Sequence, residues 1–255
     1  MTRPPARAAV VPSALALTAL LTVAACSAAG SGTAPAAAPA SPAATAPSPA
    51  GAPTLTDAQA QAALITAGDL GEPWTPTQGA ATWRDGLLKA SADVPECGRL
   101  LDALYAEELF GPDARILAVA GLDDDWYQAQ LHYQVVTHPP AEVDRTLAWL
   151  RTLPRSCGEF RAKAAGGRVQ DGTVTEAALP KVGDARQGLR ITLTSETADE
   201  TTQLTLYVAA VRVGDDTITV TNGGVGEIFD SVTQAAVEIG AQRVAEVRKR
   251  GRVQV

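Results

Sequence analysis

Few side chains in this sequence have the types and spacing that catalysis requires. His132 and His138 are its two histidines. The sequence has no G-x-S-x-G elbow, no S-x-x-K pair, no H-E-x-x-H zinc motif and no phosphate-binding loop of the G-x-x-x-x-G-K-[ST] type. The acids Asp123 to Asp125 form a run typical of a solvated turn, and a metal site with converging ligands is the alternative. We therefore predict no catalytic residue, no metal site and no cofactor.

Residues 1–25 have the pattern of a secretion signal. Arg3 and Arg7 precede the apolar run VVPSALALTALLTVAA, whose final Val-Ala-Ala leads directly into Cys26. An apolar residue and two small residues before a cysteine resemble the bacterial lipobox, in which the cysteine is diacylated and becomes the first residue. We predict attachment to the cell membrane through Cys26, on the extracytoplasmic side, because two acyl chains give a stable anchor. An uncleaved transmembrane helix is the alternative.

A linker follows the predicted anchor. Residues 26–53 contain, after the cysteine, only Ala, Gly, Ser, Thr and Pro, so they cannot form an apolar core. We predict that this segment is a disordered tether; the alternative is a disordered leftover segment with no spacing role. We predict one folded domain over residues 54–255. The whole chain has a formal net charge of −7. An acidic protein is a poor match for nucleic acid, so we expect no nucleic-acid partner.

Within the domain, hydrophobic periodicity alternates between helical and extended patterns. Thr56 and Gln59 have capping-box spacing at the start of a helix. We predict an α+β fold with a mainly antiparallel sheet flanked by helices. The last helix should turn Phe229, Val232, Ala236 and Ile239 inward. The expected helices are residues 56–67, 98–110, 139–153 and 228–249, with a short turn near residue 157, and the expected strands are 114–122, 126–137, 187–194, 202–213 and 217–222.

One predicted strand has an unusual polar face. The segment WYQAQLHYQVVT alternates strictly, which predicts a half-buried strand in a hairpin with the preceding ARILAVAGL. Amide and aromatic side chains together can hydrogen-bond and stack, so we predict that the polar face binds a ligand where helices leave it uncovered. An ordinary solvated face is the alternative. The predicted ligand-binding residues are Trp126, Gln128, Gln130, His132 and Gln134, and the face predicted to be buried holds Tyr127, Ala129, Leu131, Tyr133 and Val135.

A glycine-rich segment, NGGVGEIF, precedes the last predicted helix. Backbone N–H groups at such a position can hold an anion. The segment lacks the third glycine of the dinucleotide-binding spacing, so a plain turn is the favoured interpretation.

Two cysteines remain once Cys26 is assigned to the anchor. Cys97 and Cys157 are an even pair in a chain predicted to be exported, which predicts a disulfide. Neither belongs to a C-x-x-C motif or has a histidine nearby, so two free thiols for metal or redox chemistry are the weaker alternative.

Several segments resemble a known family. The lipobox, the Ala/Pro tether and the segments ITAGDLGEPWT, ECGRLL, LRTLPRSCGEF and VGDARQG are together similar to actinobacterial lipoproteins with a sensor domain like the extracellular domain of PknH-type Ser/Thr kinases. The resemblance covers roughly residues 55–250. It implies an antiparallel sheet, a cleft, disulfides and ligand sensing without catalysis. This chain departs from the kinases in having one candidate disulfide where they have two, and in having no kinase segment.

Two classes of function follow from these patterns. The first is a membrane-anchored extracytoplasmic lipoprotein that binds a cell-envelope ligand or a partner protein without catalysis. The alternative is a cell-envelope hydrolase that uses scattered carboxylates such as Asp184 or Asp216.

Overall fold

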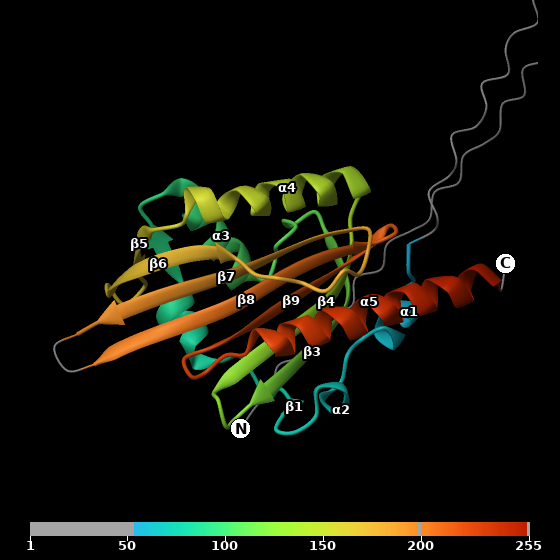
Figure 1. Ribbon diagram of the computed structural model, residues 1–255, viewed down its shortest axis with the longest axis horizontal. Coiled ribbons are helices and arrows are strands. Elements are labelled where there is room, and N and C mark those ends of the chain that lie inside the picture. Colours follow the sequence, from blue (N-terminus) through green and yellow to red (C-terminus); the bar gives the residue numbers. More distant parts are fainter. Residues whose placement is uncertain (1–53, 198–199, 254–255) are drawn as a thin grey trace, which may run out of the picture. The chain divides into compact units, whose positions relative to one another are not determined.

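One antiparallel sheet organises the folded part of the chain (Figure 1). The computed structural model describes residues 54–197 and 200–253. In this part of the chain nine strands form one sheet in which every strand is antiparallel to its neighbours. The predicted α+β fold is therefore confirmed. The predicted signal, the lipidation site Cys26 and the tether lie outside the described residues.

The sheet has long central strands and very short edge strands. Its order is β1-β3-β4-β9-β8-β7-β6-β5-β2. None of the helices in the described part of the chain is long and apolar enough to cross a membrane. The strands are β1 (Thr75–Pro76), β2 (Ala90–Ala92), β3 (Arg115–Asp124), β4 (Ala129–Thr137), β5 (Phe160–Ala164), β6 (Val169–Glu176), β7 (Ala185–Glu196), β8 (Thr201–Val213) and β9 (Asp216–Gly224). The helices are α1 (Asp57–Ala62), α2 (Ala67–Leu70), the π-helical turn η1 (Arg84–Leu88), α3 (Pro95–Ala106), α4 (Pro140–Ser156) and α5 (Asp230–Val253).

The predicted hairpin is present as β3 and β4, in the predicted register. Leu131 and Tyr133 are fully buried, and Leu131 pairs with Leu122 of β3. Strand β4 begins only at Ala129, so the three residues before it belong to the hairpin loop and not to the strand. Alternation of side chains therefore predicted the buried face correctly from Ala129 onward. It placed the start of the strand too early, and Tyr127, predicted to be buried, lies in the loop and is 37% exposed.

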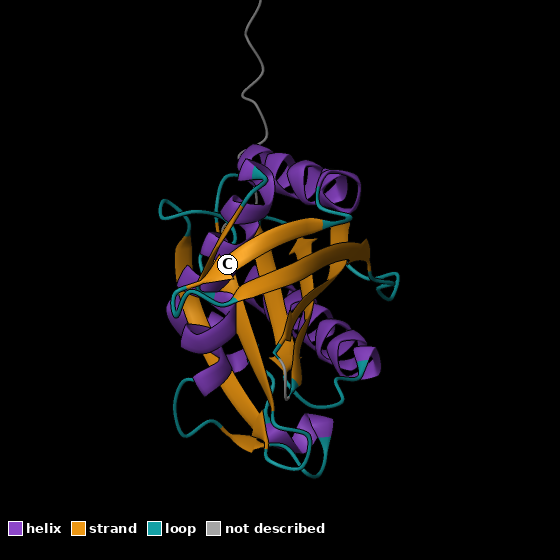
Figure 2. Cartoon of the chain, turned by 90° about the vertical axis from the view of Figure 1, so that its left-hand side faces the viewer, coloured by secondary structure: helices purple, strands orange, loops and turns teal. Residues whose placement is uncertain are grey.

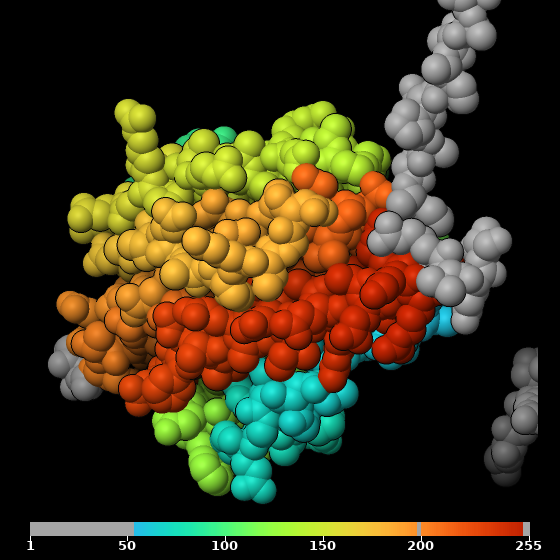
Figure 3. Space-filling model, turned by 45° about the vertical axis from the view of Figure 1, so that its right-hand side comes forward, coloured from blue at the N-terminus to red at the C-terminus, as the bar shows by residue number. Residues whose placement is uncertain are grey.

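Helices cover both faces of the sheet (Figure 2). On one face α4 packs against β6 and β7, and α3 packs against β2 and α4. On the other, α1 packs against β3, and α5 lies across β8 and β9 (Figure 3). The expectation that one face is left open to a ligand is wrong over most of the sheet, because each face has its own apolar core. The first core includes Leu100, Leu150, Leu189, Ile191 and Leu206, and the second includes Leu131, Tyr133, Ile218, Val220 and Val237.

The inward stripe of α5 differs from the prediction. Ala236 is buried as expected, whereas Phe229 precedes the helix and is 39% exposed. Thr233 and Arg248 are buried instead, because Thr233 contacts Asn222 and Arg248 contacts Asp216, both in β9. The buried stripe lies about one position from the predicted one, and the predicted Val232 and Ile239 are only partly buried. The buried residues of α5 include Thr233, Ala236, Val237, Ala241, Val244 and Arg248.

Several other boundaries differ from the predictions. The first helix, capped by Thr56 and Gln59 as predicted, ends at Ala62, and the separate helix α2 begins at Ala67. Helix α4 continues through Pro154 to Ser156, which replaces the separate helical turn expected there. Strands β5 and β6 were not predicted.

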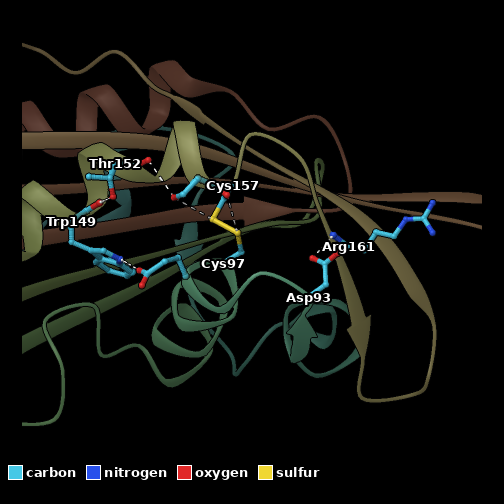
Figure 4. The surroundings of a disulfide bond; sticks show 8 residues. Asp93, Cys97, Trp149, Thr152, Cys157 and Arg161 are labelled. Carbon is cyan, nitrogen blue, oxygen red and sulfur yellow. Dashed lines mark hydrogen bonds between the residues drawn. A yellow bond between two sulfur atoms is a disulfide. The ribbon is translucent and has the colours of Figure 1, made fainter.

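The predicted disulfide joins α3 to the end of α4 (Figure 4). Cys97 and Cys157 are fully buried, and their Cα atoms are 5.7 Å apart. Next to the bond, Nε1 of Trp149 donates a hydrogen bond of 2.7 Å to Glu96, which ties the two helices together a second time. The backbone carbonyl of Cys157 accepts a hydrogen bond from the N–H of Val174 in β6, 2.8 Å away. The disulfide therefore holds the two helices together, and the hydrogen bond from Val174 attaches the end of α4 to the sheet.

Candidate functional site

The loop of the β3–β4 hairpin places a large aromatic side chain in solvent. Oδ1 of Asp124 accepts hydrogen bonds from the backbone N–H groups of Trp126 (3.0 Å) and Tyr127 (3.1 Å), which fixes the loop as an Asx turn. Gln128 completes the reversal with a φ of 53°, a left-handed conformation uncommon for residues other than glycine. Trp126 is left 75% exposed.

The glycine-rich segment before α5 supports this loop from behind. A Cβ atom on Gly224 would lie 2.3 Å from the carbonyl oxygen of Gln128, and one on Gly226 would lie 2.1 Å from that of Tyr127. Only glycine permits such close contact between two backbones. The ring of Phe229 meets the ring of Tyr127 edge to face, with centroids 5.0 Å apart. The segment is thus a packed turn, the interpretation that the sequence favoured.

An open pocket lies beside the loop. Its volume is about 510 Å³. One wall comes from the hairpin and the other from the segment between β1 and η1. Gln130 joins the two walls, because its Nε2 donates to the carbonyl of Gly79 and to Oδ1 of Asp123, both at 2.8 Å. The lining residues are Gln78, Gly79, Ala80, Ala81, Thr82, Trp83, Asp123, Asp125, Gln128, Ala129, Gln130 and Val225.

Some polar side chains of this pocket are hydrogen-bonded within the domain, and others have no such partner. Asp123 accepts a hydrogen bond on each carboxylate oxygen, from Gln130 and from the backbone N–H of Gln78. The side chains of Asp125 and Gln128 have no hydrogen-bond partner among the described residues. These two free side chains line the pocket, whereas Trp126, which lies between them in the sequence, is not one of the lining residues.

The other two predicted ligand-binding residues do not reach this pocket. Gln134 is buried, and its amide bonds the carbonyl of Glu107 (3.2 Å) and the hydroxyl of Thr219 (3.0 Å). His132 lies beneath the end of α3, where its Nε2 is 3.2 Å from Oε2 of Glu107. Both side chains belong to the interior of the domain, because α3 covers this part of the face that the sequence predicted to be open.

Arg84 and Glu107 form an ion pair next to the side chain of His132. Arg84, almost fully buried, contacts Oε1 of Glu107 at 2.9 Å and donates to the carbonyl of Tyr105 at 2.9 Å. Burial lowers the pKa of His132 from its ordinary value of 6.5, the Glu107 carboxylate raises it and Arg84 lowers it. The cluster is a structural contact between η1, the end of α3 and β4.

The five predicted residues are thus split between two places. Trp126, Gln128 and Gln130 gather at the hairpin end, while His132 and Gln134 lie farther along β4 under α3. The sequence analysis missed residues 78–83, which form the second wall of the pocket. No periodicity marks this segment, and hydrogen bonds to the side chains of Gln130 and Asp123 bring it to the site.

The carboxylates considered for hydrolysis have structural contacts. Asp216 is fully buried, where it pairs with Arg248 and accepts a hydrogen bond of 3.0 Å from the backbone N–H of Leu55. Asp184 accepts a hydrogen bond of 2.6 Å from the backbone N–H of Gly214. No group of three histidine, cysteine or acidic side chains converges in a metal-binding arrangement within residues 54–197 and 200–253.

Comparison with known proteins gives likenesses in structure only. No protein-family model and no curated protein match the sequence. The chain is similar to the extracellular domain of PknH from Mycobacterium tuberculosis, with a TM-score of 0.47 and 16% identity, over 78% of this chain and 100% of that one. It is also similar to an uncharacterised Mycobacterium smegmatis protein, the Rv0999 ortholog, with a TM-score of 0.32 and 17% identity, over 59% of this chain and 75% of that one. The PknH-like resemblance expected from the sequence motifs is therefore found among solved structures.

Proposed function

We propose that this protein is an extracytoplasmic lipoprotein, held on the cell membrane through Cys26, whose domain binds a cell-envelope ligand or partner without catalysing a reaction. The proposed binding site is the pocket at the hairpin end, together with the exposed ring of Trp126. The tether of residues 27–53 would hold this site away from the membrane surface.

The anchor is supported by the order of its parts along the chain. Arg3 and Arg7, the apolar run and the Val-Ala-Ala before Cys26 stand in the order that export and lipidation require. The Cys97–Cys157 disulfide agrees with an oxidising compartment, because such bonds are rare in the cytosol.

The anchor can be tested on the protein from native membranes. Mass spectrometry should find a diacylated Cys26 at the N-terminus of the processed chain. Cys26→Ser should accumulate as an uncleaved precursor, because the modified thiol is lost. An intact Met1 in the membrane fraction of the wild-type protein would contradict the proposal.

The observation that supports ligand binding is the exposure of Trp126 beside an open, polar pocket. A tryptophan this exposed gains no stability from burial, while a rigid Asx turn and the packed glycine segment hold its backbone in place. The free side chains of Asp125 and Gln128 provide one acceptor group and one group that both donates and accepts. A ring with such neighbours suits a neutral ligand that has an apolar face and several hydroxyl or amide groups, as sugars and peptides have.

The contacts of the acidic residues favour binding over hydrolysis. Glycoside hydrolysis needs one carboxyl group to donate a proton and a second to act as base or nucleophile. Of the two acids that line the pocket, Asp123 accepts hydrogen bonds from Gln78 and Gln130 and so connects the two walls. Asp125 alone is free there, and the domain places Asp184 and Asp216 in other contacts.

A ligand screen distinguishes the two functions. Residues 27–255 are mixed with cell-wall fragments, lipids and peptides, and both the melting temperature and the formation of products are measured. We expect stabilisation by a ligand without turnover. Trp126→Ala and Gln128→Ala should abolish the shift while leaving the melting temperature of the free protein unchanged. Val169→Ala, which also removes an exposed apolar side chain, is the control that should bind normally. Turnover by pure wild-type protein would overturn the proposal.

A further inference from the structure

A second pocket lies where β6 leaves β7, away from the hairpin end. Its volume is about 490 Å³. Arg151 reaches it from α4, and Arg186 reaches it from β7. The backbone of residues 176–179, which leads out of β6, forms the remaining wall.

The walls of this pocket are built by close packing of the backbone. A Cβ atom on Gly188 would lie 2.5 Å from the carbonyl oxygen of Ala177, so glycine at this position lets the outgoing chain lie directly on β7. Gln187, which also lines the pocket, is only 6% exposed, and its Nε2 donates to the carbonyl of Gly188 at 3.1 Å. The pocket therefore has a buried polar lining residue and does not depend on a loose surface loop.

The two arginines of this pocket, unlike most arginines of the domain, contact neither a carboxylate nor an aromatic ring. Arg84, Arg212, Arg243 and Arg248 each contact a carboxylate, and Arg99 and Arg190 stack on aromatic rings. Arg151 and Arg186 have no ion pair among residues 54–197 and 200–253. Nη1 of Arg186 makes only a long contact of 3.5 Å with the carbonyl of Val182. Arg155 and Arg168 are also unpaired among these residues, so the distinguishing feature of Arg151 and Arg186 is that both line one pocket.

We propose that this second pocket binds the phosphate group of a phosphate monoester. A guanidinium group donates two parallel hydrogen bonds to a phosphate, and two such groups match the charge of a monoester, which is close to −2 at neutral pH. The volume exceeds that of a phosphate alone and leaves room for the organic part. Glu176 is the one acidic residue of the lining, and it weakens anion binding from one side.

The proposal is tested by calorimetry with inorganic phosphate and with glycerol phosphate. Residues 27–255 contain both apolar cores and the disulfide, so this chain is used without a membrane. We expect millimolar or tighter binding, which Arg151→Gln and Arg186→Gln each weaken by about tenfold. Arg155→Gln, an exposed arginine one turn further along α4, is the matched control and should change binding by less than about twofold. Glu176→Gln should strengthen binding by about threefold.

A second measurement keeps the proposal testable if a variant is unstable. In the wild-type protein, phosphate should shift the Nε–Hε NMR signals of Arg151 and Arg186 and leave that of Arg155 in place. Vesicles of phosphatidylcholine with and without phosphatidic acid distinguish a lipid headgroup from a soluble monoester, and binding to either supports the site. Absence of phosphate-dependent shifts at both arginines, or equal weakening by Arg155→Gln, would overturn it.

Discussion

Nε2 of His132 lies 3.2 Å from the carboxylate of Glu107, at the point where α3 ends over strand β4. The same carboxylate contacts Arg84, so a histidine, an acid and an arginine from three separate elements meet in one partly buried cluster. Burial is the largest influence on His132 and lowers its pKa from 6.5. The imidazole is consequently neutral in the folded protein at neutral pH.

The burial of His132 predicts a loss of stability in mild acid. Because the pKa of His132 is lower in the folded than in the unfolded chain, the unfolded chain binds more protons as the pH falls below about 6.5. The free energy of unfolding should therefore decrease from about pH 6.5 down through the pKa of the folded state. Urea unfolding at a series of pH values measures the decrease. An NMR titration of the imidazole signals should give a pKa below 6.5 in the native protein.

The control for this prediction removes the titrating group and keeps a polar side chain. His132→Asn should lower stability at neutral pH, since a contact with Glu107 is lost, and should flatten the pH dependence between about pH 6.5 and 5. If the variant shows the same slope as the wild-type protein, His132 does not cause it.

A second prediction concerns the buried pair of Asp216 and Arg248. Removal of Arg248 leaves a fully buried carboxylate without its cation, and such loss of one partner typically costs about 3 to 5 kcal/mol. Arg248→Met should therefore lower the free energy of unfolding strongly, as measured by urea denaturation. Arg250→Met, two residues along α5, removes an exposed pair with Glu246 and should have no measurable effect. Equal losses in the two variants would contradict a special role for the buried pair.

Burial also raises the pKa of the Asp216 carboxyl, while Arg248 and the N–H of Leu55 lower it. The net effect is a folded-state pKa above the ordinary 3.8. Folding therefore favours the protonated carboxyl of Asp216 at acid pH, and this contribution to stability has the opposite sign from that of His132.

The sequence predicted those features that depend on local periodicity. The strand register of Leu131 and Tyr133 and the capping box of Thr56 with Gln59 follow from neighbours within a few residues, and both are correct. The pairing of Cys97 with Cys157 was predicted because export left one possible partner for each. Short spacing decided the first two cases, and the number of cysteines left after Cys26 decided the third.

The parts that could not be predicted depend on contacts between distant residues. Gln134 has the polarity of a surface residue, and only the position of Glu107 and Thr219 in space shows that it is buried with partners. The inward stripe of α5 was misplaced because several sets of apolar residues could form it, and only packing against β8 and β9 selects Val237, Ala241 and Val244. The pocket wall of residues 78–83 carries no periodic signal and is held by hydrogen bonds to Gln130 and Asp123.

A third prediction tests the disulfide. Cys97 and Cys157 are separated by 60 residues, and a closed loop of this length should stabilise the fold by about 4 kcal/mol in the chain-entropy model. The double variant Cys97→Ser, Cys157→Ser should lose about this amount in urea unfolding. Peptide mapping without reductant should find the two segments linked in the wild-type protein. Two thiols open to alkylation in freshly exported protein would contradict the pairing.

The last prediction concerns the support of the hairpin end. Gly226 has an ordinary backbone conformation, yet a Cβ atom there would lie 2.1 Å from the carbonyl oxygen of Tyr127. Gly226→Ala should therefore push the β9–α5 connection away from the hairpin loop, cost about 1 to 3 kcal/mol and separate the rings of Tyr127 and Phe229. Thermal unfolding measures the cost, and the fluorescence of Trp126 in the same loop reports the displacement.

Gly86→Ala is the matched control, because no atom lies within 4 Å of the position of its Cβ. It should leave both the melting temperature and the fluorescence nearly unchanged. If Gly226→Ala were equally silent, the hairpin end would not depend on the glycine segment. Trp126 would then be a mobile surface residue, without the fixed backbone that the proposed binding site requires.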